Sequence, residues 1–205
     1  MTYSYLDIAS TPSVKAAQEA NGALDLWSVA GKERTFDRFS AAEREYIAAR
    51  DSFYMATVSE SGWPYVQHRG GPPGFLKVLD EKTLASADFR GNRQYISVGN
   101  LGADDRVSLI LVDYAARRRL KIFAHAEISE DPDMVAAVSI PGYRAKVERA
   151  LVFRLEAFDW NCPQHITPRF TVAEIQEGVT SLQQKIAELE AENRNLRARL
   201  GVLDT

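Results

Sequence analysis

The stretch that decides the fold is residues 53–75, FYMATVSESGWPYVQHRGGPPGF. Two segments in it, 53–59 and 63–69, are rich in β-branched and aromatic residues and follow a period of two, which is typical of strands. Between them lies Glu60-Ser61-Gly62, a short turn in which the glycine can adopt a positive φ. The pattern therefore predicts an antiparallel hairpin that ends in the glycines and prolines of 70–74.

Similar strand pairs follow along the chain. Segments 76–79 and 83–87 flank a short turn, and segments 106–113 and 120–128 form a third predicted hairpin. A last strand is expected over residues 150–160. Many antiparallel strands with few helices predict a mainly β fold (β+α), with a barrel-like core rather than a doubly wound sheet.

Short helices are predicted around these strands. Residues 11–27 have a weak helical pattern that Gly22 interrupts. Ser40-Ala-Ala-Glu43 has the spacing of a capping box, so a helix should follow it through Arg50. Asp131-Pro132 should open another helix, with the aspartate as N-cap and the proline at the first helical position.

The composition excludes several classes of function. The 205 residues carry a net charge of −3, so no global basic field indicates nucleic acid or an anionic membrane as a partner. No apolar run approaches the roughly 20 residues needed to span a bilayer. No secretory signal is visible near the N-terminus, and the single cysteine, Cys162, excludes an intrachain disulfide. A cytoplasmic location is the simplest expectation.

The C-terminal segment has a heptad repeat, in which apolar residues recur at alternating steps of three and four from Val172. β-branched residues at a with leucine at d favour two parallel helices, and a lone asparagine at a penalises other registers. The a positions are Val172, Val179, Ile186, Asn193 and Leu200, and the d positions are Ile175, Leu182, Leu189, Leu196 and Leu203.

The charges beside this repeat agree with a parallel pair. Lys185 at g faces Glu190 at e of the partner helix, and Glu192 at g faces Arg197 at e. The alternative is an amphipathic helix packed on its own domain, which has no use for an asparagine in the seam. We therefore expect an N-terminal helical segment (1–50) packing on a β-rich domain (51–170), followed by a dimeric coiled coil (171–203).

Familiar catalytic motifs are absent from the sequence. No GxGxxG follows a strand, and neither a Walker sequence nor a Gly-x-Ser-x-Gly elbow occurs. His68, His125 and His165 are far apart in the sequence. Cys162 and His165 would supply only half of a metal site, so we expect no metal and assign no catalytic residue.

Polar residues gather in two segments instead. Gln67, His68 and Arg69 lie on a β-forming strand that runs into glycines, which let a planar ligand approach the backbone; a glycine-proline bulge at a barrel corner is the alternative. Residues 88–94, DFRGNRQ, lead into a helical stretch at 95–101, which Asn92 would cap. A helix N-terminus beside two arginines suits a phosphate, and solvated arginines at a capped helix are the alternative.

Over roughly residues 36–170 the chain resembles the pyridoxamine 5'-phosphate oxidase-like flavoproteins, in the segments 53–59, 62–75, 88–94, 105–109 and 159–162. It is similar to a bacterial subgroup rather than to the vitamin B6 oxidase, whose substrate-phosphate arginine and histidine have no clean match here. The resemblance implies an antiparallel split β-barrel of the FMN-binding type. The N-terminal helices and the C-terminal coiled-coil helix are predicted from the sequence pattern, and the coiled coil is an addition to the usual barrel. It also implies a homodimer joined through the barrels, with FMN at the subunit interface.

The resemblance also implies a set of cofactor-binding residues. Three residues on the second strand would line the flavin ring, and the segment after the fourth strand would hold the phosphate. An asparagine reaching across the dimer and a Trp-Asn pair from the partner subunit would complete the site. The set is Gln67, His68, Arg69, Asp88, Asn92, Arg93, Asn100, Trp160 and Asn161.

The expected function is that of an FMN-dependent oxidoreductase acting on an unidentified small molecule. No residue in the sequence is an evident general acid or base, which leaves a second hypothesis: a non-catalytic flavin- or haem-binding carrier or sensor. Haem would need an axial ligand, for which the candidates are His68 and His165. FMN is the expected cofactor, with a related deazaflavin as the alternative. A barrel that serves only as a passive head on the dimerising helix is the third hypothesis.

Overall fold

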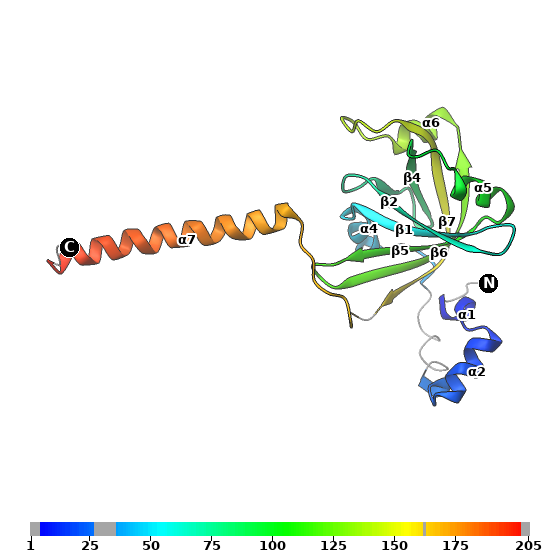
Figure 1. Cartoon of the computed structure of the whole chain (residues 1–205), viewed down its shortest axis with the longest axis horizontal. Coiled ribbons are helices and arrows are strands. Elements are labelled where there is room, and N and C mark those ends of the chain that lie inside the picture. The colour runs from blue at the N-terminus through cyan, green and yellow to red at the C-terminus, as the bar shows by residue number, and fades with distance from the viewer. Residues whose placement is uncertain (1–4, 27–35, 162, 202–205) are drawn as a thin grey trace. The chain divides into compact units, whose positions relative to one another are not determined.

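The computed structural model describes residues 5–26, 36–161 and 163–201. The chain divides into two compact units, one made of residues 1–113 with 117–165 and the other of residues 114–116 with 166–205. The first unit contains the β-sheet, and the second contains one long helix (Figure 1). No helix among the described residues is both long enough and apolar enough to cross a membrane.

The strands of the first unit form one curled antiparallel sheet (Figure 1). Its order is β2-β1-β5-β6-β7-β4-β3. This sheet confirms the predicted mainly β fold. The strands span Ser52–Val58 (β1), Pro64–Gly70 (β2), Leu76–Val78 (β3), Thr83–Phe89 (β4), Arg106–Asp113 (β5), Arg118–Ser129 (β6) and Val147–Asn161 (β7).

The β1–β2 hairpin fixes which side chains of β2 face inward. Phe53 lies opposite Arg69, and Met55 lies opposite Gln67. Phe53 and Met55 are fully buried. Directly opposed residues share a face of the sheet, so the side chains of Gln67 and Arg69 lie on the inner side. The predicted turn is confirmed, with Gly62 at a φ of 82°.

The core fills the curled sheet with large apolar side chains. The largest of those that are fully buried are Phe53, Phe75, Phe153, Phe158, Ile47, Met55, Leu76, Leu84, Leu109, Leu111, Leu120 and Ile122. Gly71 is required where the chain leaves β2, because a Cβ there would lie 2.7 Å from Cγ of Phe75. The glycine thus allows the Phe75 ring to pack against the backbone.

Short helices surround the sheet, and two of their predicted starts are confirmed. Ser40 and Glu43 form the expected capping box, and Asp131 is an N-cap followed by proline. The helices of the first unit are α1 (Tyr5–Ala9), α2 (Pro12–Ala20), α4 (Ala41–Ala48), α5 (Ile96–Ala103) and α6 (Pro132–Val138). The second unit contains α7 (Val172–Arg199), which begins with a capping box of Thr171 and Glu174.

Glu43 joins the start of α4 to the end of β7. Its carboxylate accepts hydrogen bonds from the Ser40 N–H at 3.0 Å and from the indole Nε1 of Trp160 at 2.8 Å. Tyr46, one turn further along α4, packs edge-on against the Trp160 ring. Desolvation opposes ionisation of this carboxyl, but the hydrogen bonds from Ser40 and Trp160 outweigh it and hold the pKa of Glu43 below its ordinary value of 4.5.

We predict that Glu43→Gln lowers the free energy of unfolding by about 1–2 kcal/mol at pH 7, because two hydrogen bonds to a charged acceptor are weakened. The native pKa of Glu43 is lowered, so its contribution is present above pH 4.5 and is lost as the pH falls through the native pKa. Urea unfolding between pH 7 and pH 3 measures the difference between wild type and variant. Glu45→Gln, on the exposed side of α4, is the control and should show no such pH dependence.

Candidate functional site

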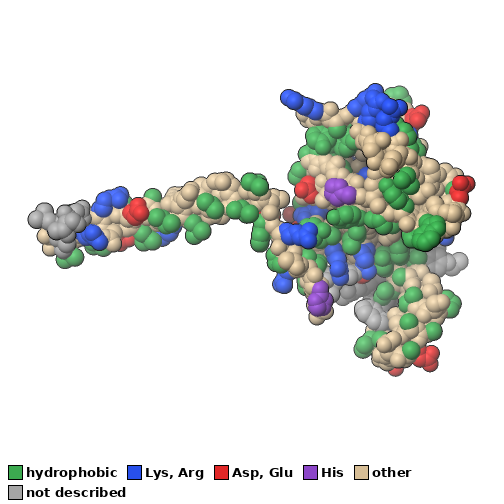
Figure 2. Space-filling model, in the orientation of Figure 1, with side chains coloured by type: hydrophobic (Ala, Val, Ile, Leu, Met, Phe, Trp, Pro, Cys, Tyr) green, Lys and Arg blue, Asp and Glu red, His purple; other side chains and the backbone are tan. Residues whose placement is uncertain are grey.

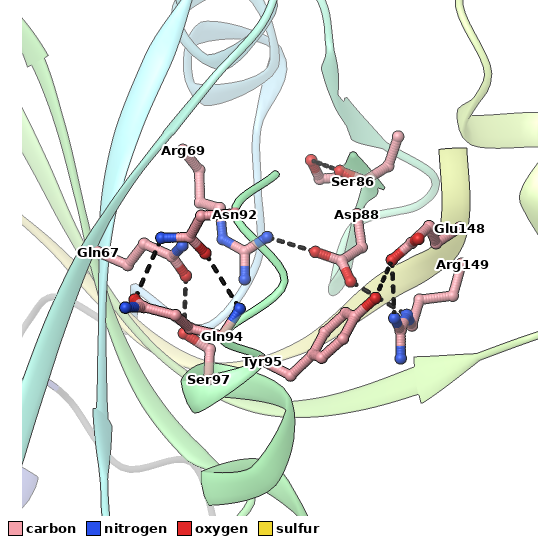
Figure 3. A network of polar contacts seen from close by, with 11 residues as sticks. Gln67, Arg69, Ser86, Asp88, Asn92, Gln94, Tyr95, Ser97, Glu148 and Arg149 are labelled. Carbon is pink, nitrogen blue, oxygen red and sulfur yellow. Dashed lines mark hydrogen bonds and ion pairs between the residues drawn. The ribbon is translucent and has the colours of Figure 1, made fainter. Parts of the chain in front are cut away.

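The site is built around the carboxylate of Asp88, near the end of β4. One of its oxygens pairs with Nη1 of Arg69 on β2 at 2.5 Å, and the other lies 3.1 Å from Nε of Arg149 on β7 (Figure 3). The three side chains are 7%, 13% and 16% exposed. β2 is one end of the sheet and is not hydrogen-bonded to β4 or β7, so this ion pair joins β2 to two strands near the opposite end of the curled sheet.

A second carboxylate, Glu148, extends the network. It lies 3.1 Å from Nη2 of Arg149, and the hydroxyl of Tyr95 donates to it at 3.1 Å (Figure 3). Nε of Arg90 lies 3.3 Å from its other oxygen. Desolvation opposes its ionisation, but the hydrogen bonds from Tyr95 and Arg149 outweigh that effect and lower the pKa of Glu148 below 4.5. The carboxylate is therefore charged at neutral pH.

The cluster has an excess of positive charge and a spare donor. Four guanidinium groups, those of Arg69, Arg90, Arg93 and Arg149, accompany the carboxylates of Asp88 and Glu148, which leaves two positive charges uncompensated. Nε of Arg69 is buried and has no hydrogen-bond partner among the described residues; Nε of Arg149 faces Asp88 but is not aligned for a hydrogen bond. Such groups suit an anion that brings acceptor oxygens.

A cavity of about 210 Å³ opens beside this cluster. It lies between β2, the end of β4, the turn at 91–95 and the first turn of α5. It brings together Gln67, Arg69, Asp88, Asn92 and Arg93, which are five of the residues expected from the sequence. The others that line it are Tyr65, Phe89, Gly91, Gln94, Tyr95, Ile96, Ser97 and Val98.

The turn before α5 differs from the prediction. Asn92 does not cap the helix: its Oδ1 accepts from the Gln94 N–H at 3.1 Å, a local Asx-type bond that asparagine favours. The N-cap is Tyr95, in a left-handed conformation with a φ of 52°, and it makes no side-chain hydrogen bond to the helix. The first turn of α5 therefore lies along the cavity without a capping side chain, and its N–H groups favour an anion there.

Ser97 links α5 to β2, since its hydroxyl donates to Oε1 of Gln67 at 2.9 Å (Figure 3). Asn100 lies one turn further along α5 and is buried, with its amide donating to Oγ1 of Thr57 at 2.9 Å. Asn100 thus lies outside the cavity lining and has a partner within its own chain.

Two further expected residues also lie away from the cavity. His68 is on the outer face of β2, opposite Tyr54, with ring centroids 5.4 Å apart. Trp160 packs on Tyr46 and Glu43, and the guanidinium of Arg118 lies 4.6 Å from the centre of its ring. Asn161 ends β7, and its side chain, like the whole of Cys162, lies outside the described part of the structure.

Arg149 and Glu148 were not among the predicted site residues, because they lie on the last strand, far in sequence from residues 67–69 and 88–94. The available signal was the charge pattern: Arg149 comes directly before the apolar run 150–153 and is nearly buried there. A charged side chain in a buried position needs a partner of opposite charge. The pattern could have indicated that a carboxylate lies nearby, although not that it is Asp88.

Comparisons with known proteins bear on the fold. The pyridoxamine 5'-phosphate oxidase family model matches residues 39–161. HupZ of Group A Streptococcus is 15% identical over 64% of this chain and 99% of its own, with a TM-score of 0.51. This likeness, with the family match, confirms the split-barrel fold class. No curated protein sequence is significantly similar to the chain.

Two other solved structures are similar at lower TM-scores. An FMN-binding protein from Syntrophomonas wolfei is 14% identical over 59% of this chain and 89% of its own, with a TM-score of 0.43. HutZ, the heme storage protein from Vibrio cholerae, is 17% identical over 60% of this chain and 94% of its own, with a TM-score of 0.40. A shared fold does not by itself determine which ligand a protein binds.

We predict that Asp88→Asn destabilises the protein by about 3 kcal/mol, because two largely buried guanidinium groups lose the carboxylate between them. The free energy of unfolding in urea measures the loss. Glu127→Gln is the matched control, since it removes a strand carboxylate that pairs with Arg154 on the exposed surface and should cost less than about 1 kcal/mol. Equal losses in the two variants would show that the Asp88 network does not hold the sheet ends together.

Proposed function

The chain belongs to the pyridoxamine 5'-phosphate oxidase family, and on that premise we propose that it is an FMN-dependent oxidoreductase whose flavin phosphate occupies the cavity beside Asp88. The observation that carries the proposal is the excess of positive charge at an uncapped helix N-terminus. A dianionic phosphate balances the two uncompensated charges and provides acceptors for the free donors.

Each group of the cavity has a part in this proposal. Arg93 and the first N–H groups of α5 hold the phosphate, because both line the wall of the cavity that lies across from β2. Gln67 and Arg69 on β2, which line the cavity, orient the ring. FMN, when bound, supplies the electron-transfer chemistry. The substrate is a small reducible molecule that reaches the exposed face of the ring.

A non-catalytic flavin carrier is the second candidate, and one observation favours it. No imidazole lines the cavity within the described residues: His68 lies on the outer face of β2, and His165 and His125 are not among the lining residues. The titratable neighbours are the phenols of Tyr65 and Tyr95, besides the ion-paired groups.

The lack of a histidine among the described lining residues also disfavours haem, which would need an axial ligand on the cavity side. Turnover of reduced flavin with an added acceptor separates an enzyme from a carrier.

We also propose that the outer face of β1 and β2 packs against the barrel of a second copy. Three of its apolar side chains are exposed: Val66 is 61% exposed, Val58 38% and Tyr54 37%. In this dimer Trp160 and Asn161 of each barrel would approach the flavin of the other. Because the indole N–H of Trp160 is held by Glu43, the ring rather than its N–H would make that contact.

We predict that Arg93→Ala weakens FMN binding at least about tenfold, or about 1.4 kcal/mol, while riboflavin binding changes less than about twofold. The reason is that riboflavin lacks the phosphate that Arg93 is proposed to hold. Quenching of flavin fluorescence measures both affinities. Arg154→Ala removes an exposed arginine of β7 that does not line the cavity, and it should leave both affinities unchanged. Equal loss of FMN and riboflavin in Arg93→Ala would refute the phosphate role.

The barrel interface can be tested in a full-length chain whose heptad seam is disabled by Leu182→Glu and Leu189→Glu. We predict that this chain still sediments as a dimer at micromolar concentration, because the barrels remain paired. Adding Val66→Glu should convert it to a monomer, since a charge would then be buried in the interface. Adding Ser61→Glu in the exposed β1–β2 turn is the control and should leave the dimer intact. A monomer before either addition would contradict the barrel interface.

A further inference from the structure

Helix α7 carries an apolar stripe that the barrel's proposed function does not use. Its a and d residues are well exposed, among them Leu182 at 66%, Ile186 at 55% and Leu189 at 51%. Figure 2 shows hydrophobic side chains along the length of this helix. We propose that the α7 helix of a second copy packs on this stripe, parallel and in register, as a two-stranded coiled coil.

The helix is continuous enough to form such a pair. It runs without interruption over Val172–Arg199, a length of about 42 Å at 1.5 Å per residue. A capping box at Thr171 and Glu174 satisfies its first N–H groups, and Arg197 and Arg199 lie in its last turn. Most of a helix's stability in proteins comes from the packing of its apolar face, so a partner on this stripe would stabilise α7.

The asparagine in the stripe identifies the partner as a second copy. Asn193 lies on this stripe beside Ile186, Leu189, Glu190 and Arg197. An amide in an apolar seam is costly unless a partner bonds it. In a parallel, in-register pair of identical chains the amide meets its own mate, whereas a shifted register would place it against leucine or isoleucine.

The flanking charges select the same arrangement. In a parallel pair, Lys185 faces Glu190 of the partner helix and Glu192 faces Arg197 of the partner helix, so both contacts are attractive. Lys185 now pairs with Glu188 of its own helix at 3.2 Å, in an exposed contact that is worth little and can be exchanged. The flanking charges and Asn193 therefore both favour a second copy of α7, packed parallel and in register.

The pairing has a consequence for the flavin site, which rests on the proposed function. In the proposed function each flavin is held by two barrels. Only the short segment 166–170 separates each barrel from α7, so once the two helices are paired the two barrels associate as if they were parts of one molecule. The effective concentration of one barrel near the other is then in the millimolar range. Flavin occupancy would not fall when the protein is dilute.

The test of the helix pairing is cross-linking in the full-length chain. Single cysteines are placed at Asn193→Cys or Ala191→Cys, both in a Cys162→Ser background, and treated with a short bismaleimide at low micromolar protein. Position 193 faces the seam, whereas position 191 points outward, and outward positions on two packed helices lie about 20 Å apart. We expect at least fivefold more covalent dimer from Asn193→Cys. Equal yields, or no dimer from Asn193→Cys, would overturn the proposal.

A second measurement keeps this inference separate from the proposed function. FMN titrations at 0.1 and 10 micromolar protein, in wild type and in Leu182→Glu with Leu189→Glu, report on the flavin site alone. We expect the same affinity at both concentrations in wild type and at least fivefold weaker binding at the lower concentration in the variant. Strong cross-linking without any FMN binding would refute the proposed function and leave the coiled coil standing. An affinity in the variant that does not depend on protein concentration would refute the coupling.

Discussion

The ion pair between Asp88 and its two arginines is the interaction on which the rest of the site depends. It joins the free end strand β2 to β4 and β7, which the backbone hydrogen bonds of the sheet do not do. Burying three charged side chains is costly, and the arrangement is tolerable only because each finds an opposite charge within reach. It holds the curled sheet at the place where the cavity opens, so the stability of the barrel and the shape of the site depend on the same atoms.

The same arrangement determines what the site can bind. Asp88 and Glu148 are occupied with structural pairing, and the guanidinium groups outnumber them. The turn at 91–95 leaves the first turn of α5 without a capping side chain, beside Arg93. The site can therefore neutralise and position an anion, but within the described residues it offers no imidazole for proton transfer. This division is typical of proteins in which the cofactor carries the chemistry and the chain supplies binding and orientation.

Much of this architecture could be predicted from local sequence patterns. The hairpins, the capping box at Ser40 and the proline-started helix at Asp131 depend on near neighbours, and all are present. The start of α5 could not be predicted in the same way, because an asparagine such as Asn92 can either cap a helix or close a local turn, and the sequence does not distinguish the two. The pairing of Asp88 with Arg149 was also beyond reach, since it depends on β7 lying between β6 and β4. His68 was grouped with Gln67 and Arg69 because the three are adjacent in sequence. Side chains alternate along a strand, so Gln67 and Arg69 lie on one face of β2 and His68 lies on the other.

The measurement that tests the central claim most directly is the visible absorption and fluorescence of the purified full-length protein before and after addition of FMN. We expect flavin bands that are shifted from those of free FMN, quenched fluorescence, and saturation at one flavin per chain. Inorganic phosphate in excess should then weaken the binding, because it competes for the same donors. A protein that remains colourless and leaves the fluorescence of added FMN unchanged would show that the cavity beside Asp88 is not a flavin site.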